Sequence, residues 1–167
     1  EGPHTLYVIG KDSFNNWQPI VNATTFTWTI DLSPPIAILD NLPTNPTKST
    51  GTSITVTGSQ VVEYKYQIDG AGWSYPISIS HPIAERDLTE GEHTIHVIGK
   101  DQAGNWQNET SPSSYTWNID ISAPTVELTN TPANPTNVTS INIKVGGMQV
   151  TQYKYKIDSG SWSGSIS

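Results

Sequence analysis

The sequence contains no cysteine, so it can form no disulfide bond, thiolate metal site or cysteine nucleophile. Basic residues are also scarce: eight lysines and arginines stand against fifteen aspartates and glutamates, giving a formal net charge of −7. This balance argues against a nucleic-acid partner, which requires a basic face, and suits a soluble surface or one that attracts divalent cations. No apolar run reaches the length of a membrane-spanning helix, so we expect no membrane insertion in this segment.

Catalytic motifs are missing as well. The sequence has no nucleophile-elbow motif, no phosphate-binding loop and no closely spaced histidine and glutamate residues of the kind that hold a catalytic metal. No window shows the apolar periodicity of an amphipathic helix. We therefore expect a non-enzymatic protein without catalytic residues, built from strands and turns.

The most informative feature that is present is an internal repeat with a period of 89 residues. Residues 1–18 return, with substitutions but no insertion, as residues 90–107, and residues 64–69 return as residues 153–158. A period this long corresponds to a whole domain rather than to the short unit of a solenoid. The sequence therefore predicts tandem modules connected in series.

Each module is predicted to be an antiparallel β-sandwich. Apolar and polar residues alternate, so that Tyr64, Tyr66 and Ile68 share one face of their segment; this pattern is typical of a strand with one buried face. Strands are expected near residues 36–40, 53–58, 62–69, 73–79, 83–88, 93–101 and 113–121. Seven strands in one period, separated by turn-forming residues, favour an immunoglobulin-like or fibronectin-III-like sandwich.

Two proline-containing segments, residues 31–35 and 120–124, are predicted to link the modules. Proline cannot continue a central strand and holds the chain extended, so these links should be short and stiff. The predicted domains are therefore the C-terminal part of a preceding module (1–33), one complete module (34–122) and the N-terminal part of a following module (123–167).

The two outer parts would each expose half of a hydrophobic core, and together they lack the counterpart of residues 79–89. Two interpretations are open. Either the chain is a window onto a longer tandem array, or it is a subunit whose C-terminal part completes the N-terminal part of a neighbouring copy, giving a head-to-tail fibre. Packing of the two parts together within one chain is not expected, because they leave opposite ends of the central module.

A family resemblance is carried by two stretches. Lys-Asp-x-Ala-Gly-Asn-Trp at residues 100–106, followed by Tyr-Thr-Trp-Asn-Ile-Asp-Ile-Ser-Ala-Pro at residues 115–124, resembles the bacterial Ig-like repeats of large surface proteins and adhesins. The resemblance covers the whole chain. It implies an extracellular or cell-surface location, and Ca²⁺ bound between adjacent modules by the aspartate before the linker and the Asp-x-x-Gly-Asn loop. The candidate calcium ligands are Asp31, Asp101, Asn105, Asp12, Asn16 and Asp120.

The topology of an immunoglobulin-like sandwich predicts which of these residues meet. Its last strand ends at the pole where the next module begins, and the turn between its last two strands lies at the opposite pole, facing the preceding module. Asp31, at the end of one module, should therefore lie against the turn formed by residues 101–105 of the next. Calcium takes six to eight oxygen ligands, which carboxylates, amides and carbonyls supply. The alternative is ordinary turn chemistry, because aspartate and asparagine bond their own backbone and tolerate positive φ. Asn15 stands where the other copy has Gly104, which indicates a left-handed turn position.

Aromatic residues suggest a second class of function. Trp73 and Trp162 lie near Tyr64 and Tyr153 in the sequence, and such a group can form a sugar-stacking platform. The alternative is that the tyrosines point inward and the tryptophans pack over the edge of a core.

Two functional hypotheses therefore remain. The first is a stalk, adhesin segment or filament of an extracellular surface protein, whose partners are adjacent modules, copies of itself, or a cell-surface receptor or glycan. The second is a carbohydrate-binding accessory module of a secreted enzyme.

Overall fold

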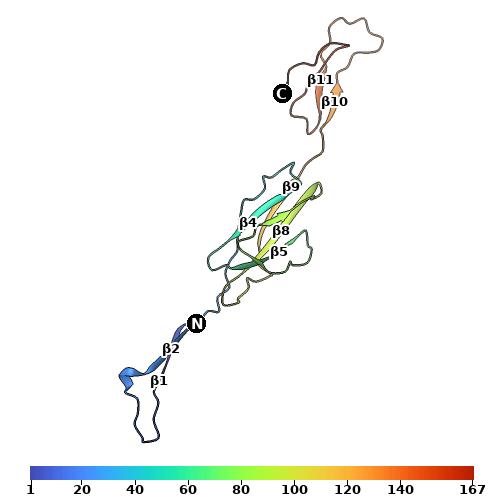
Figure 1. Cartoon of the computed structure of the whole chain (residues 1–167). Coiled ribbons are helices and arrows are strands. Elements are labelled where there is room, and N and C mark those ends of the chain that lie inside the picture. The colour runs from blue at the N-terminus through green and yellow to red at the C-terminus, as the bar shows by residue number, and fades with distance from the viewer. The chain divides into compact units, whose positions relative to one another are not determined.

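The structure, a computed structural model, describes all 167 residues and is all-β, with antiparallel sheets (Figure 1). Its elements are β1 (Gly2–Val8), η1 (Ile20–Asn22), β2 (Thr24–Ile30), β3 (Ile38–Asp40), β4 (Thr52–Thr57), β5 (Glu63–Ile68), β6 (Ile77–Ser78), β7 (Ile83–Glu85), β8 (Gly91–Lys100), β9 (Ser113–Ile119), β10 (Thr125–Thr129) and β11 (Lys144–Met148). Two compact units are present, Glu1–Asp120 and Ile121–Ser167. None of the elements is a helix of the length and apolar character that a membrane span requires.

The strands from β3 to β9 form two sheets. One contains four strands in the order β6-β5-β8-β9, and the other three in the order β3-β4-β7. Buried apolar side chains from both sheets belong to a single cluster, so the sheets pack face to face in the manner of a β-sandwich. The members of this cluster are Ala37, Ile54, Val56, Tyr64, Ile83, Ile95, Val97, Trp117 and Ile119.

Alternation along the strands explains which side chains fill this core. In β8 the buried positions include His93, Ile95 and Val97, which are two residues apart and therefore share one face. In β5 Tyr64 is fully buried, and its hydroxyl donates a hydrogen bond to the backbone carbonyl of His81 at 2.8 Å. Each large apolar side chain removed from water in this way contributes about 1.5–3 kcal/mol to folding.

The predicted strand over residues 73–79 is much shorter in the structure, where only Ile77–Ser78 form β6. The Ser74 hydroxyl accepts a hydrogen bond from the backbone N–H of Tyr66 at 3.1 Å, in place of a backbone carbonyl. Pro76, which follows, has no N–H to donate. Side-chain competition and proline therefore limit the strand to Ile77 and Ser78.

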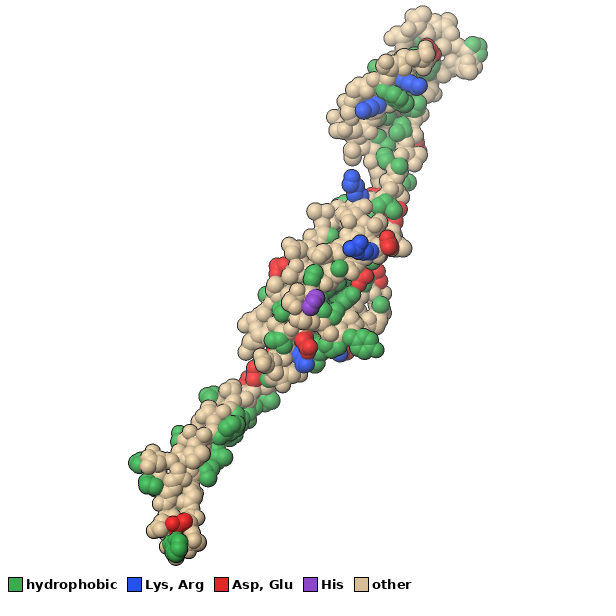
Figure 2. All heavy atoms as spheres, in the orientation of Figure 1, with side chains coloured by type: hydrophobic (Ala, Val, Ile, Leu, Met, Phe, Trp, Pro, Cys, Tyr) green, Lys and Arg blue, Asp and Glu red, His purple; other side chains and the backbone are tan.

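The first 33 residues of the first unit form a separate hairpin in which β1 pairs with β2. Its register, Gly2↔Ile30 through Val8↔Thr24, is that of β8 and β9, where Gly91 pairs with Ile119. Unlike β8 and β9, the hairpin leaves its apolar side chains exposed. Figure 2 shows such side chains gathered along the surface of the hairpin.

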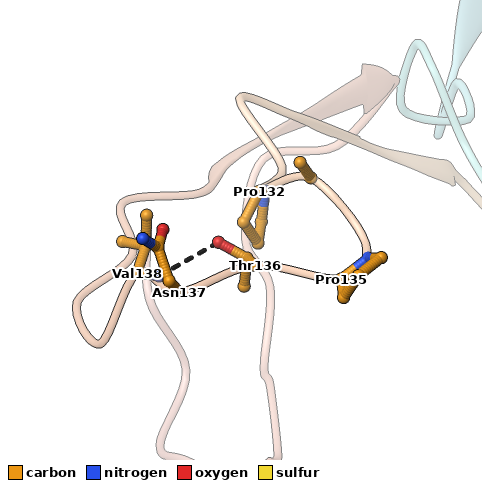
Figure 3. Close-up of a pocket in the computed structure, with 6 residues that line it drawn as sticks. Pro132, Pro135, Thr136, Asn137 and Val138 are labelled. Atoms are coloured by element: carbon orange, nitrogen blue, oxygen red, sulfur yellow. Dashed lines mark hydrogen bonds between the residues drawn. The ribbon is translucent and has the colours of Figure 1, made fainter.

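The second unit consists of the β10–β11 pair and long connecting segments. Glu127 pairs with Gly146, as Ile38 pairs with Thr57 in the β3–β4 pair of the first unit. The loop between β10 and β11 surrounds an open hollow, lined by Pro132, Ala133, Pro135, Thr136, Asn137 and Val138 (Figure 3). Inside this loop the backbone N–H of Val138 donates to the Thr136 hydroxyl at 3.1 Å.

Candidate functional site

The end of the hairpin meets the turn between β8 and β9 through Asp31 and Asn105. The side-chain amide of Asn105 donates one hydrogen bond to the backbone carbonyl of Asp31, at 3.0 Å, and another to Asp101 Oδ2, at 2.9 Å. Asp31 also holds the start of the linker, since its Oδ1 accepts a hydrogen bond from the backbone N–H of Ser33 at 3.1 Å. Asp31, Asp101 and Asn105, which the sequence predicted to meet, therefore lie together.

Asp101 organises this turn from a buried position. Its Oδ1 accepts hydrogen bonds from the backbone N–H groups of Gly104 and Asn105, both at 2.8 Å. Burial raises the pKa of the Asp101 carboxyl, but the hydrogen bonds from Asn105, Gly104 and Ala103 outweigh it, so the pKa lies below its usual value. Gly104 has φ of 101°, the left-handed conformation that the sequence indicated at this position.

The hairpin carries a second turn of the same construction. Asp12 Oδ1 accepts hydrogen bonds from the backbone N–H groups of Phe14 and Asn16, both at 2.8 Å, and Oδ2 accepts one from the Asn16 amide at 2.9 Å. The Asn16 side-chain bond, together with the backbone bonds, lowers the pKa of the exposed Asp12 carboxyl. Asn15 has φ of 71°, as expected.

The remaining predicted calcium residue, Asp120, lies just after β9, where its backbone N–H donates to the carbonyl of Thr47 at 2.9 Å. Asp12 and Asn16 form their own turn, so only Asp31, Asp101 and Asn105 are brought together as a set. No three His, Cys, Asp or Glu side chains gather into a group that could hold a metal ion.

The chemistry of the junction suits calcium only in part. Oxygen atoms of the Asp31 carbonyl and the Asp101 carboxylate are of the right type. However, Asn105 directs its NH₂ group toward both oxygens, where a cation would need the amide oxygen instead. The arrangement is a hydrogen-bonded junction, and calcium coordination would require the Asn105 amide to reverse.

The structure also reveals an ion pair between the buried His93 and the exposed Asp69. His93 Nδ1 lies 2.7 Å from Asp69 Oδ2, and His93 Nε2 lies 2.8 Å from the carbonyl of Thr89. Both partners are acceptors, so both contacts are hydrogen bonds only when the ring is protonated and both of its nitrogens donate. The bond to Thr89 raises the pKa of His93 most, burial lowers it, and Asp69 raises it further, so that the net shift is upward.

The aromatic residues are divided between the core and the surface. Tyr64 is fully buried, as the core-packing alternative predicted, and Trp73 is half-buried, whereas Trp162 in the second unit is exposed. The half-buried Trp106 lies beneath two cations, with Lys65 Nζ 4.7 Å and Lys100 Nζ 5.6 Å from its ring centroid. These contacts stabilise the outer face of the four-stranded sheet.

The first unit also has a shallow hollow beside β5, lined by Tyr66, Gln67, Ile68, Ala71, Gly72, Ser74, Glu85 and Leu88. The Tyr66 hydroxyl donates to Glu85 Oε1 at 2.6 Å. Burial and this bond raise the pKa of Tyr66 to about 12, so its hydroxyl stays protonated at neutral pH. The pair thus joins the two sheets at this point.

No model of a known protein family matches the chain, and no curated protein sequence matches it.

Proposed function

We propose that the chain is a non-enzymatic structural segment of an extracellular surface protein, in which immunoglobulin-like modules of 89 residues are joined in series as a stalk, adhesin shaft or filament. The single observation that carries the proposal is the hydrogen bond from the Asn105 amide to the Asp31 carbonyl. It fastens the end of one strand pair to a turn of the module that follows.

Two kinds of correspondence support the modular part of the proposal. The β1–β2 and β8–β9 pairs have the same register, displaced by 89 residues. The turns that follow β1 and β8 also match: Asp12 accepts from Asn16 as Asp101 accepts from Asn105, each at 2.9 Å. A chain that repeats strands, register and turns repeats a structural unit, and a stiff linear assembly follows from joining such units end to end.

The mechanical role comes from the short linker. Asp31 bonds both Ser33, inside the linker, and Asn105, on the next module, and Pro34 and Pro35 follow directly. Proline restricts the backbone of this segment and of the residue before it. A linker restricted at both ends limits bending between modules, which is what a projecting stalk needs.

The rigidity of this junction can be tested by removing the Asn105 amide. NMR relaxation and residual dipolar couplings on the unmodified chain should show residues 1–33 and the central sandwich reorienting together. In Asn105→Ala the hairpin should reorient faster and independently. Asn16→Ala is the matched control, because it opens the equivalent turn without touching Asp31, and it should leave the coupling intact. Independent motion in the unmodified chain would overturn the proposal.

A carbohydrate-binding accessory module is the second candidate, favoured by the exposed Tyr75 close in sequence to the half-buried Trp73. Loss of glycan binding in Trp73→Ala on a glycan array would support it. The inward position of Tyr64 removes one aromatic from the platform that this candidate requires.

A further inference from the structure

One loop of the central sandwich carries a sequence motif that the proposed function does not use. Residues 108–111 read Asn-Glu-Thr-Ser and connect the turn after β8 to the segment that enters β9. An Asn-x-Thr triplet in which x is not proline is the acceptor motif for N-linked glycosylation. Asn108, Glu109 and Thr110 are all exposed, so a modifying enzyme can reach the triplet on the folded surface.

The Asn108 side chain presents the nitrogen atom that this modification uses. Its Oδ1 accepts two hydrogen bonds from Thr110, one from the backbone N–H and one from the hydroxyl, both at 2.9 Å. A backbone N–H can only donate, so the atom that faces Thr110 is the amide oxygen. The amide nitrogen Nδ2 occupies the other branch of this exposed side chain and makes no hydrogen bond. The acceptor nitrogen is therefore available without breaking any contact of the fold.

The loop is held in one conformation by bonds to its backbone. The N–H of Ser111 donates to the carbonyl of Asn108 at 3.0 Å and closes a turn. The side-chain amide of the buried Gln107 donates to the Ser111 carbonyl at 3.1 Å, and its Oε1 accepts from the N–H of Ala37 at 2.9 Å. The loop is thus anchored to the interior of the sandwich while its asparagine side chain faces solvent.

The hairpin contains the equivalent loop, residues 19–22, which is closed by the same two bonds. The N–H of Asn22 donates to the carbonyl of Pro19 at 2.9 Å, and the side-chain amide of Gln18 donates to the Asn22 carbonyl at 2.6 Å. A second Asn-x-Thr triplet, residues 22–24, begins in this loop, and Asn22 is exposed. Both copies of the loop therefore carry an acceptor motif.

The two motifs do not occupy equivalent positions, and this difference is informative. A shift of 89 residues aligns Asn108 with Pro19 and Ser111 with Asn22. The acceptor stands at the first position of the loop in one copy and at the last position in the other. Retention of the motif on one loop, rather than at one aligned residue, favours a role of the loop over a chance match.

A third triplet, residues 137–139, has no such support. It lies between β10 and β11, and its counterpart in the first unit begins with Lys48 instead of asparagine. Only Asn22 and Asn108 are therefore supported by both copies of the repeat.

We propose that Asn108 and Asn22 are N-glycosylation sites, each carrying a glycan on its side-chain nitrogen. The donor is a sugar activated as a diphosphate ester. In the transfer the bond between the sugar C1 and the diphosphate oxygen breaks, and a bond from C1 to Nδ2 forms. One Nδ2 proton passes to a base of the transferring enzyme, and the diphosphate leaves with the bonding electrons, so no oxidant or reductant is required. The inference goes beyond the proposed function and depends on it only for the extracellular location.

The position of the loop fits a group added at the surface. Asn105, in the turn just before the loop, donates to the Asp31 carbonyl at 3.0 Å, so the loop lies at the end of the sandwich that meets the hairpin. A glycan on Asn108 adds a bulky, hydrated group there and replaces none of the hydrogen bonds of the junction. An extracellular shaft of such modules would carry sugar close to its junctions.

Peptide mapping by mass spectrometry, on the chain isolated from the cells that make it, tests the proposal. Digestion at lysine and arginine gives residues 12–48, with Asn22, and residues 101–144, with Asn108 and Asn137; a second digestion at acidic residues separates the last two. Enzymatic release of N-glycans in heavy-oxygen water converts each occupied asparagine into labelled aspartate. We expect label at Asn108 and at Asn22. The same chain made by cell-free synthesis without sugar donors is the unmodified reference and should show none.

Variants of the triplets separate N-glycosylation from other modifications. Thr110→Val keeps Asn108 but removes the hydroxyl that the motif requires, and it should abolish the label at Asn108 while Asn22 stays labelled. Thr110→Ser retains a hydroxyl, is the matched control and should keep the label. Thr24→Val should do the reverse of Thr110→Val, with label lost at Asn22 alone. These side chains are exposed, so each variant should fold normally.

Absence of label at either asparagine of the isolated chain overturns the proposal. Label at Asn108 that persists in Thr110→Val overturns it too, because such a modification would not depend on the motif. Neither result alters the test of the Asp31–Asn105 junction, which uses the chain without glycans, so the two proposals fail separately.

Discussion

His93 and Asp69 form a charged pair at the edge of the core, with 2.7 Å between His93 Nδ1 and Asp69 Oδ2, and the ring is held on its other side by the Thr89 carbonyl. The imidazole also lies 5.7 Å from the ring of Trp117. A neutral ring has only one N–H and would leave one of the two acceptors without a donor. The two contacts therefore favour the protonated ring over the neutral one.

This pair predicts a pH dependence of stability. The folded-state pKa of His93 is raised, so its contribution to the free energy of unfolding is complete below the unfolded value of about 6.5 and is lost as pH rises through the folded value. Urea unfolding should show the unmodified chain to be more stable at pH 6 than at pH 9. His93→Gln should flatten this difference, and the exposed His4→Gln should not. An unchanged slope in His93→Gln would contradict the assignment.

Replacing Trp117 by alanine should lower the free energy of unfolding far more than the same change at its counterpart, Trp28. Trp117 is 1% exposed and belongs to the core, so Trp117→Ala should destabilise the sandwich by about 3–5 kcal/mol. Trp28 is 40% exposed, and Trp28→Ala in dilute solution should cost less than about 1 kcal/mol. Denaturant titration of the full chain measures both. Similar costs for the two would mean that Trp28 is packed as deeply as Trp117.

Removing the buried Gln107 side chain should show how much its hydrogen bonds contribute to stability. Its side chain accepts from Ala37 and Gly99 and donates to the Ser111 carbonyl at 3.1 Å. Gln107→Ala leaves buried groups unpaired, each worth about 1–3 kcal/mol, and should lower the unfolding midpoint clearly. Gln18→Ala, in the exposed hairpin, is the matched control and should leave the midpoint of the central sandwich unchanged. A Gln107→Ala chain as stable as the unmodified one would show that these hydrogen bonds do not stabilise the sandwich.

Adding a side chain at Gly58 should strain the backbone and destabilise the fold. Its φ is 141°, and a Cβ there would contact the Ile36 carbonyl and lie 2.7 Å from Val61 Cγ2. Gly58→Ala should therefore destabilise the fold by about 1–3 kcal/mol. Gly72→Ala meets open space and is the control. Thermal unfolding of the two variants side by side checks this, and equal midpoints would show that the backbone at Gly58 adapts without strain.

Calcium can be tested at the junction itself. If a cation bound there with the Asn105 amide reversed, the unmodified chain would melt at a higher temperature with millimolar CaCl₂ than with EGTA, and Asn105→Ala would lose that difference. The hydrogen bonds of Asn105 to Asp31 and Asp101 predict the same melting temperature in both buffers. Calorimetry distinguishes the two outcomes, with Asn16→Ala as the control.

Alternation of apolar and polar residues was sufficient to predict most of the strands and the inward face of Tyr64, because burial in a sheet depends on a period of two. The turn at residues 101–105 was also predictable, since the repeat placed the same motif at both positions, and its contact with Asp31 was predicted from the order of strands in an immunoglobulin-like sandwich. Strand β6 was overestimated because the competition of Ser74 with the backbone depends on geometry rather than on composition.

The pairing of His93 with Asp69 and the role of Gln107 were not predictable from the sequence. His93 and Asp69 are 24 residues apart, and Gln107 reaches Ala37 across 70 residues. Only the packing of one sheet on the other brings such groups together. Once one pair is known, however, the repeat indicates its counterparts, as it does for His4 and Asp158.

The edges of the central sheets are short or covered. Strands β3 and β7 have three residues each and β6 has two, while the end of β9 is covered by the parallel bridge between Thr47 and Ile119. Long, flat, open edges recruit strands from neighbouring molecules and lead to amyloid-like stacking. The short strands β3, β6 and β7 and the covered end of β9 therefore offer little open edge to which a neighbouring molecule could add a strand.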